Sequence, residues 1–216
     1  MLFTPLLFAA AIAKAAWPAL LACPKVSVPG SASGTGVIIA TRDGFAYLLT
    51  AAHVIGDFDA VDLAVTTRTR FPQPDWYPLK VEVLARWPDP DTALIRFPLN
   101  GKTVSVLPLA PAWQRPRNFP AAGRSIGMGN DPARIARGES ISAREFIARQ
   151  GKQPAFFWRT EVPPEHGRSG GPLLDERGRV IGIAVAAGGT RGYYAHHDEI
   201  VAALKRADHG WLIPSK

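Results

Sequence analysis

The stretch Gly167-Arg168-Ser169-Gly170-Gly171-Pro172 places one serine among three glycines before a closing proline. Glycine allows a tight turn where a side chain would clash, so this loop can expose a hydroxyl and direct backbone N–H groups toward it. A nucleophilic serine needs both features, since the N–H groups stabilise the oxyanion formed in acyl transfer. Gly-Ser-Gly-Gly is also an ordinary loop composition, so the stretch alone leaves a plain loop open.

Two motifs upstream supply the partners that such a serine needs. The first is Leu49-Thr50-Ala51-Ala52-His53-Val54-Ile55, in which the imidazole can take a proton and return it. The second is Asp91-Thr92-Ala93-Leu94-Ile95, whose carboxylate can orient that imidazole. Asp89 competes for this role, but only Asp91 directly precedes the Thr-Ala-Leu-Ile run. Read singly, the histidine fits an apolar core and either aspartate fits a turn.

Together the three motifs resemble those of the chymotrypsin-like serine peptidases, which include the bacterial trypsin-like and HtrA-type enzymes. The order His, Asp, Ser matches that family and differs from the Ser, Asp, His order of α/β-hydrolases. The resemblance covers roughly residues 34–204. It implies a triad of His53, Asp91 and Ser169, and an oxyanion hole formed by the backbone N–H groups of Gly167 and Ser169.

Turn signals at short intervals divide the chain into strands rather than alternating strands and helices. The expected strands are Val37–Thr41, Phe45–Thr50, Val61–Thr67, Leu79–Ala85, Thr92–Phe97, Arg124–Gly127, Ser140–Ala143, Phe156–Glu161, Pro172–Leu174, Val180–Ala186 and Gly192–His196. Arg42-Asp43-Gly44 is typical of a hairpin turn. A helix is expected over Asp198–Arg206, with Asp198 as its N-cap.

A proline-rich segment, Ala110–Pro120, separates two β units, because Pro111, Pro116 and Pro120 cannot continue a strand ladder. The predicted units are residues 27–112 and residues 118–213, which together form one peptidase domain. With the family resemblance, the predicted fold is all-β, with two six-stranded antiparallel β-barrels and a short C-terminal helix.

Residues 1–23 are almost wholly apolar and resemble an export signal, although no basic residue precedes the apolar run. Leu20-Leu21-Ala22-Cys23 is similar to a bacterial lipoprotein signal, in which the cysteine is lipidated. An ordinary apolar role for Cys23 is the alternative. We expect an exported protein, either periplasmic, secreted or anchored to a membrane through this segment. With one cysteine, no disulfide can form within the chain.

The formal net charge of +7 comes mainly from residues 115–216, which carry 16 basic and 10 acidic side chains. The arginines there are dispersed rather than clustered, so a solvated basic surface is expected and nucleic acid is not an expected partner.

The resemblance also places a substrate pocket before the nucleophile loop and on the two strands after it. Its predicted residues are Pro163, Pro164, Glu165, Ala184, Val185, Ala186 and Gly192. No acid falls at the pocket base near Pro163, so a small or aliphatic side chain is expected in place of lysine or arginine. Arg168 stands where family members often carry Asp or Asn, so activation by a freed N-terminus is not expected.

These features predict a serine endopeptidase that forms an acyl-enzyme on a protein or peptide substrate, as a monomer without metal or cofactor. His166, His196 and His197 lack the spacing of an HExxH zinc motif. Two alternatives remain open. One is an inactive protease-fold binding module, and the other is an esterase or a self-processing peptidase.

Overall fold

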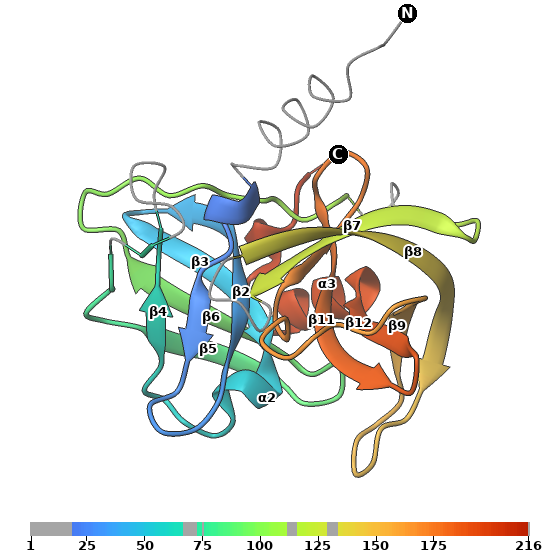
Figure 1. Cartoon of the computed structure of the whole chain (residues 1–216). Helices are drawn as coiled ribbons and strands as arrows, with labels where there is room; N and C mark the ends of the chain where they lie inside the picture. The colour runs from blue at the N-terminus through green and yellow to red at the C-terminus, as the bar shows by residue number, and fades with distance from the viewer. Residues whose placement is uncertain (1–18, 67–72, 75, 112–115, 129–133, 216) are drawn as a thin grey trace, which may run out of the picture.

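The computed structural model describes residues 19–66, 73–74, 76–111, 116–128 and 134–215. Two β units lie side by side, the first drawn in blue to green and the second in yellow to red (Figure 1).

The first unit is a six-stranded antiparallel sheet with the strand order β4-β1-β2-β3-β6-β5. Its elements are β1 (Lys25–Ser27), β2 (Ser33–Arg42), β3 (Phe45–Ala51), α2 (Ala52–Ile55), β4 (Asp62–Ala64), β5 (Glu82–Trp87) and β6 (Thr92–Pro98). Strand β3 lies between β2 and β6, so the end of β3 is fixed by hydrogen bonds on both sides.

The second unit is a closed antiparallel barrel with the order β10-β11-β12-β9-β8-β7. Its strands are β7 (Ala121–Met128), β8 (Arg134–Ile147), β9 (Ala155–Thr160), β10 (Pro172–Leu174), β11 (Val180–Gly188) and β12 (Arg191–His196). The ring closes because β7 pairs with β8 on one side and with β10 on the other.

The all-β prediction, with two six-stranded units and a C-terminal helix, is confirmed, and the first unit differs in one respect. Strands β4 and β5 are its edges, and no ladder joins them within the described residues of this unit, so the sheet is a half-barrel. A closed barrel needs its edge strands to pair, and β4 offers only three residues. The expected strand Val61–Thr67 ends outside the described residues.

The hairpin between β2 and β3 forms as the sequence predicts. Asp43 and Gly44 both have left-handed backbone, with φ of 51° and 78°. Two consecutive positive φ angles are typical of the type I′ turn, which favours Asp-Gly because it follows the natural twist of the strands.

The C-terminal helix α3 (His197–Arg206) starts one residue before the predicted start. Its N-cap is His196, whose Nδ1 accepts a hydrogen bond from the N–H of Asp198 at 3.0 Å. The prediction of Asp198 as the cap is therefore wrong, because the preceding imidazole already satisfies a free N–H of the first turn. Ile200 and Leu204 are buried, as the helical pattern predicts.

Residues just before β1 pack into the first unit. Leu21, Ala22 and Cys23 are buried, and the carbonyl of Ala22 accepts a hydrogen bond from the N–H of Ile38 at 2.8 Å. The predicted leader, residues 1–23, thus overlaps residues that belong to the core. Its boundary stays a prediction, and a lipidated Cys23 would have to leave this core.

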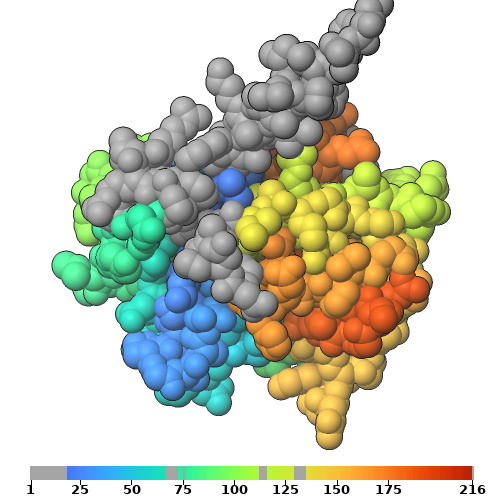
Figure 2. Space-filling view, viewed as in Figure 1, coloured from blue at the N-terminus to red at the C-terminus, as the bar shows by residue number. Residues whose placement is uncertain are grey.

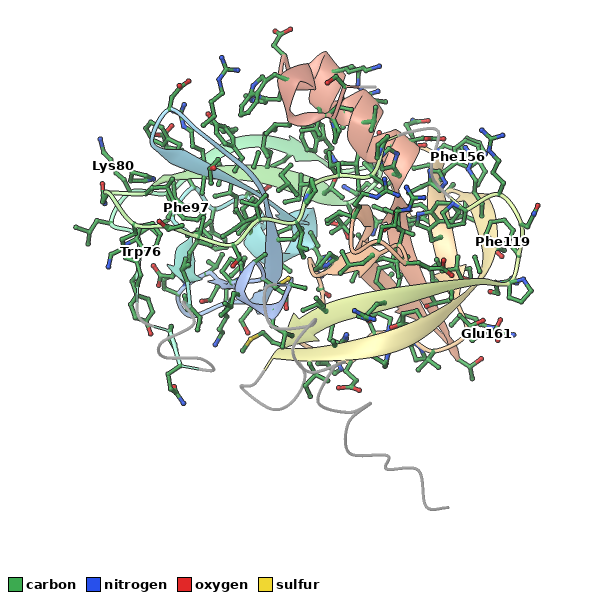
Figure 3. All side chains as sticks on the ribbon, turned by 90° about the horizontal axis from the view of Figure 1, so that it is seen from above. Trp76, Lys80, Phe97, Phe119, Phe156 and Glu161 are labelled. Carbon is green, nitrogen blue, oxygen red and sulfur yellow. The ribbon has the colours of Figure 1, made fainter. Side chains whose placement is uncertain are left out.

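The two units share one hydrophobic cluster, which includes Leu48 of β3 and Ile183 of β11. The start of the connecting segment is tied to the second barrel, since the N–H of Ala110 donates to Val180 O at 2.9 Å. The surfaces of the units adjoin in Figure 2. Figure 3 shows Trp76 beside Phe97 in the first unit, where their rings lie 5.6 Å apart.

Candidate active site

His53 and Asp91 are brought together by the pairing of β3 with β6. Ala51 lies opposite Thr92 in that ladder, so the residues just beyond these two positions meet. His53 Nδ1 lies 2.7 Å from Asp91 Oδ2, and the His53 N–H donates to Asp91 Oδ1 at 2.9 Å. Asp89 does not contact His53 and instead accepts a hydrogen bond from the N–H of Gln153.

The Asp91 carboxylate is almost completely enclosed, with 4% of the residue exposed. It also accepts a hydrogen bond on Oδ2 from Arg149 Nη1 at 2.8 Å. Burial by itself raises the pKa of Asp91, but hydrogen bonds and charge from His53 and Arg149 outweigh it, so the pKa lies below its ordinary value. The carboxylate is therefore ionised at neutral pH.

The loop before Ser169 makes a tight turn that leaves backbone N–H groups unused. The N–H of Arg168 donates to Glu165 O at 3.1 Å, and Gly167 has a φ of 84°. A positive φ at the third residue is typical of a type II turn, which favours glycine there. Among hydrogen bonds of the described residues, none uses the N–H of Gly167 or of Ser169.

The glycines after Ser169 allow two close approaches that side chains would prevent, one to the first unit and one to strand β7 of the second. A Cβ on Gly170, where φ is 84°, would lie 2.0 Å from Thr35 O. A Cβ on Gly171 would lie 2.1 Å from Ile126 O. At the close approach to the first unit, Ser169 O accepts a hydrogen bond from the N–H of Thr35 at 2.8 Å.

Thr35 links the nucleophile loop to both units, a role that was not predicted from the sequence. Its Oγ1 donates to Gly167 O at 2.8 Å and accepts from the N–H of Met128 at 2.9 Å. Thr50 Oγ1 in turn donates to Thr35 O at 2.8 Å. The only available signal was the Gly-Thr-Gly context at residues 34–36, which leaves room for a close approach.

His53 and Ser169 line the same cavity, whose volume is about 380 Å³. No hydrogen bond joins their side chains within the described residues. Such bonds are often long in the absence of substrate. His53 also lines a neighbouring cavity of about 350 Å³ that contains Asp91 and Arg149.

Several residues of the predicted substrate pocket line the cavity of Ser169. They are Pro164, Glu165, Val185 and Ala186, joined by Ala32, Ser33, Val54, His166 and Ala187. Pro163, Ala184 and Gly192 are not among its lining residues. The backbone of Ala184 bonds with Gly170 and Gly171 behind the serine, while Gly192 lies so close to Thr160 Oγ1 that a Cβ would be 2.4 Å away.

The Arg168 side chain turns away from the cavity into the second barrel, and the residue is only 2% exposed. Its Nη2 donates to Ser125 Oγ at 2.7 Å, and Ser125 Oγ donates to Glu139 Oε1 at 2.5 Å. Its Nη1 donates to Ile135 O at 3.1 Å. Burial lowers the pKa of the guanidinium. The nucleophile loop is thus fastened to β7 and β8 through a buried cation.

The same network includes two further donors to Glu139 Oε1. Arg137 Nε donates at 2.8 Å, and Tyr194 OH donates at 3.3 Å. Burial and the charge of Glu139 raise the pKa of Tyr194 to about 12, so its hydroxyl stays protonated.

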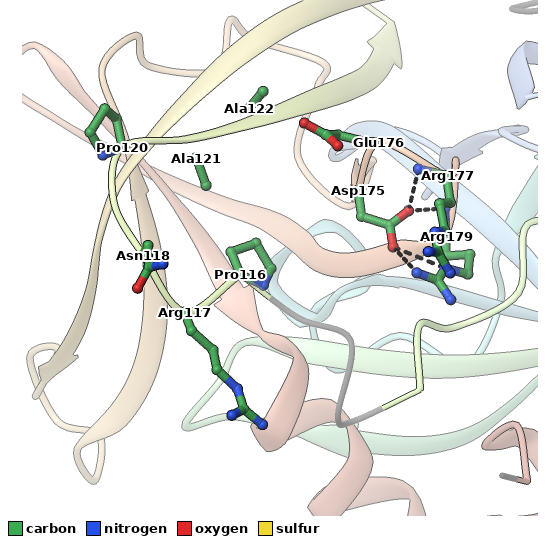
Figure 4. Close-up of a pocket in the computed structure, with 10 residues that line it drawn as sticks. All are labelled: Pro116, Arg117, Asn118, Pro120, Ala121, Ala122, Asp175, Glu176, Arg177 and Arg179. Carbon is green, nitrogen blue, oxygen red and sulfur yellow. Dashed lines mark hydrogen bonds and ion pairs between the residues drawn. The ribbon is translucent and has the colours of Figure 1, made fainter.

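A larger cavity, of about 610 Å³, lies apart from these residues, between the connecting segment and the turn from β10 to β11. Figure 4 shows Asp175 in this wall, bonded to Arg179 at 2.6 Å. The cavity shares no lining residue with the cavities that contain Ser169, His53 or Asp91.

Two other kinds of site are not found in the part of the chain that the structure describes. No group of three or more His, Cys, Asp or Glu side chains could hold a metal ion there. Within the same ranges, no helix combines the length and apolar character that crossing a membrane requires.

Two six-stranded β units around a shared core form the architecture of chymotrypsin-like serine peptidases, which is the class that this fold defines. Residues 34–183 match the trypsin-like peptidase domain, and the chain belongs to that family. The predicted family resemblance is thereby confirmed.

The proteins that this chain resembles in sequence include bacterial serine endoproteases. A probable periplasmic serine endoprotease, DegP-like, from Pseudomonas fluorescens is 30% identical over 155 residues, and one from Pseudomonas putida is 26% identical over 155 residues. Each match covers 69% of this chain, and the chain spans only 28% of the length of these relatives.

Solved structures with the same fold have lower sequence identity. The active form of the Rv3671c protease from M. tuberculosis superposes with a TM-score of 0.72 at 20% identity, covering 94% of this chain and 87% of that one. The HtrA-type protease AlgW S227A with a tripeptide gives a TM-score of 0.72 at 22% identity, covering 92% and 64%.

Proposed function

We propose that this protein is a serine endopeptidase that uses Ser169, His53 and Asp91 as its catalytic triad. The observation that carries the proposal is the 2.7 Å contact between His53 Nδ1 and the buried Asp91 carboxylate, beside a cavity that His53 shares with Ser169. The carboxylate fixes the imidazole so that Nε2 is the atom available to the serine. Family membership supports the same reaction class.

In the proposed reaction, Ser169 Oγ attacks the carbonyl carbon of the scissile bond while its proton passes to His53 Nε2. The carbonyl electron pair moves onto oxygen, and the N–H groups of Gly167 and Ser169 hold this oxyanion. Each such donor contributes about 2.7–4 kcal/mol to transition-state stabilisation. Collapse expels the amine, which takes the proton from Nε2, and water then repeats the steps to release the acid and restore Ser169.

The pocket favours a small or aliphatic side chain in the proposed substrate. Val185, Ala186 and Ala187 supply apolar walls to the cavity. Glu165 is the acid that lines this cavity, but its side chain is 52% exposed and lies 4.0 Å from Arg137. An exposed and paired carboxylate gives weak selection for lysine or arginine.

We also propose that the protein acts after export. The apolar residues 1–23 support this location, as do relatives described as periplasmic. We further propose that it acts as a monomer on protein or peptide substrates and uses neither a metal nor a cofactor.

Labelling with a fluorophosphonate probe tests the triad, because an activated serine displaces fluoride from the probe and becomes phosphonylated. We expect stoichiometric labelling of the wild type, none of Ser169→Ala, and strongly reduced labelling of His53→Ala. Circular dichroism checks that each variant is folded. A folded wild type without Ser169-dependent labelling would contradict the peptidase and favour a binding module.

A second assay separates peptidase from esterase. We expect the wild type to cleave casein into fragments and the Ser169→Ala variant to cleave none. Turnover of a p-nitrophenyl ester without any cleavage of casein or of a peptide library would favour the esterase alternative.

A further inference from the structure

Arg149 crosses from the second unit to the first and bonds with the segment that carries Asp91. It lies on the turn between β8 and β9, and its Nη2 donates to Pro88 O at 3.0 Å while Nη1 donates to Asp91 Oδ2 at 2.8 Å. The same turn makes a third contact, from the N–H of Gln153 to Asp89 Oδ1 at 2.9 Å. One turn of the barrel that carries Ser169 thus holds residues 88–91 of the other unit.

The contact with Asp91 uses the oxygen that also faces the imidazole. Asp91 Oδ2 lies 2.7 Å from His53 Nδ1 and 2.8 Å from Arg149 Nη1. An arginine is charged at every pH that a protein survives, so it offsets part of the carboxylate charge permanently. A carboxylate that is already paired with a permanent cation attracts an imidazolium less than a free carboxylate does.

Other charged groups face this pair from the surrounding elements. Asp57 and Arg86 line the same cavity from the first unit, and Lys152 lines it from the turn that carries Arg149. Arg86 is engaged elsewhere, because its guanidinium donates to Gly56 O and Phe58 O and pairs with Asp59. Glu165 and His166 line the other cavity that His53 borders, the cavity of Ser169. Arg149 is the only cation of the described residues with an ion pair to Asp91, apart from His53 itself.

We propose that Arg149 is a positioning residue that clamps Asp91 across the two units, and that its charge beside the Asp91 carboxylate extends the reactivity of Ser169 to lower pH. This inference rests on the proposed function, because it assigns a further residue to the same triad. The guanidinium side chain is 26% exposed, which leaves its interaction with the buried carboxylate only partly screened by water.

The test is the pH dependence of the rate constant for fluorophosphonate labelling, measured from pH 5 to pH 9. For Arg149→Gln we expect the midpoint of the acid limb to move up by about one pH unit, since one cation close to the pair is lost. Labelling at pH 5.5 would then fall about tenfold, while labelling at pH 9 would stay within about threefold of the wild type. A purely structural loss would lower the rate at every pH without moving the midpoint.

Two further variants provide matched controls. Lys152→Gln removes a cation from the same turn without removing a contact to Asp91, and we expect a midpoint shift below about 0.3 units. Arg149→Lys keeps the charge and is expected to keep the wild-type midpoint. A midpoint shift of about one unit between wild type and Arg149→Lys would contradict the inference, and this outcome does not depend on whether the Gln variant folds.

The inference is also overturned if Arg149→Gln is folded and its midpoint is unchanged, or if Lys152→Gln shifts the midpoint equally. In these cases the wild type still reacts at Ser169, so the proposed function survives. A wild type that is unreactive at every pH contradicts the proposed function, and the inference falls with it.

Discussion

Asp91 connects three parts of the candidate site through one side chain. It contacts the His53 ring, accepts the hydrogen bond from Arg149 and accepts the N–H of His53 in the first turn of α2. Its backbone has a φ of 56°, a left-handed conformation that aspartate and asparagine tolerate better than most residues. Asp91→Asn therefore changes the charge at this position with little change of shape.

The lowered pKa of Asp91 predicts how stability depends on pH. A carboxylate whose pKa is lower in the folded protein stabilises it above the pKa of the unfolded chain, near 3.9, and this stabilisation is lost as the pH falls through the folded value. We expect wild type to exceed Asp91→Asn in free energy of unfolding by about 1.5–3 kcal/mol at pH 7, with a smaller difference below pH 4. Urea unfolding between pH 3 and pH 7 measures it. A difference that is constant with pH would contradict this prediction.

Gly170 is a second residue whose substitution has a defined result. A methyl group there would overlap Thr35 O, and the φ of 84° strains any other residue. We expect Gly170→Ala to lower the free energy of unfolding by more than about 3 kcal/mol and to abolish fluorophosphonate labelling. Thermal unfolding and probe labelling measure the two effects.

Gly178→Ala is the matched control for Gly170→Ala. Gly178 has a φ of 76°, but a Cβ there would meet nothing within 4 Å. We expect a cost of only about 1 kcal/mol and unchanged labelling. Equal losses from the two substitutions would show that backbone strain, rather than the contact between the units, limits the loop.

At the scale of elements, the buried arginine of the nucleophile loop replaces the family's usual Asp or Asn with a cation. Arg168 reaches β7 at Ser125 and β8 at Ile135, so the loop and the barrel wall are joined. We expect Arg168→Met to lower the free energy of unfolding by about 2–3 kcal/mol, because Ile135 O loses its charged donor. We also expect the labelling rate of Ser169 to fall by more than the loss of folded protein accounts for, since the N–H groups of the loop lose their fixed direction.

Comparison with Arg177→Met separates this effect from a general loss of charge. Arg177 lies on the turn between β10 and β11 and is exposed, whereas Arg168 is buried. We expect a change in stability within about 0.5 kcal/mol and normal labelling. If Arg168→Met behaved in the same way, the buried network would not hold the loop.

At the scale of the whole molecule, residues before β1 belong to the first unit. Leu21, Ala22 and Cys23 are buried, and the N–H of Gly36 donates to Pro24 O at 3.0 Å. We expect a chain that starts at Lys25 to be less stable, by about 3 kcal/mol or more, than a chain that starts at Ala19. Calorimetry of the two chains measures the difference. Equal stability would support a leader that extends through Cys23.

Much of the fold follows from the sequence because its signals are local. Alternating apolar residues and Asp-Gly at Asp43 predict the hairpin of β2 and β3, and the prolines of Ala110–Pro120 predict the connection between the units. The half-barrel was not predictable, because whether β4 and β5 pair depends on lengths and twists that no local pattern encodes. The cap at His196 was missed because histidine is not an ordinary cap residue.

The family and the order of the predicted triad can be recognised in the sequence, since the glycines around Ser169 and the motifs at His53 and Asp91 are short runs of consecutive residues. The contact of Arg149 with Asp91, 58 positions away, and the burial of Arg168 against Ser125 appear only in the folded chain. Both contacts join residues that lie far apart along the chain. The sequence around a charged loop residue does not show whether its side chain faces water or a buried partner. The packing of the two units sets that environment.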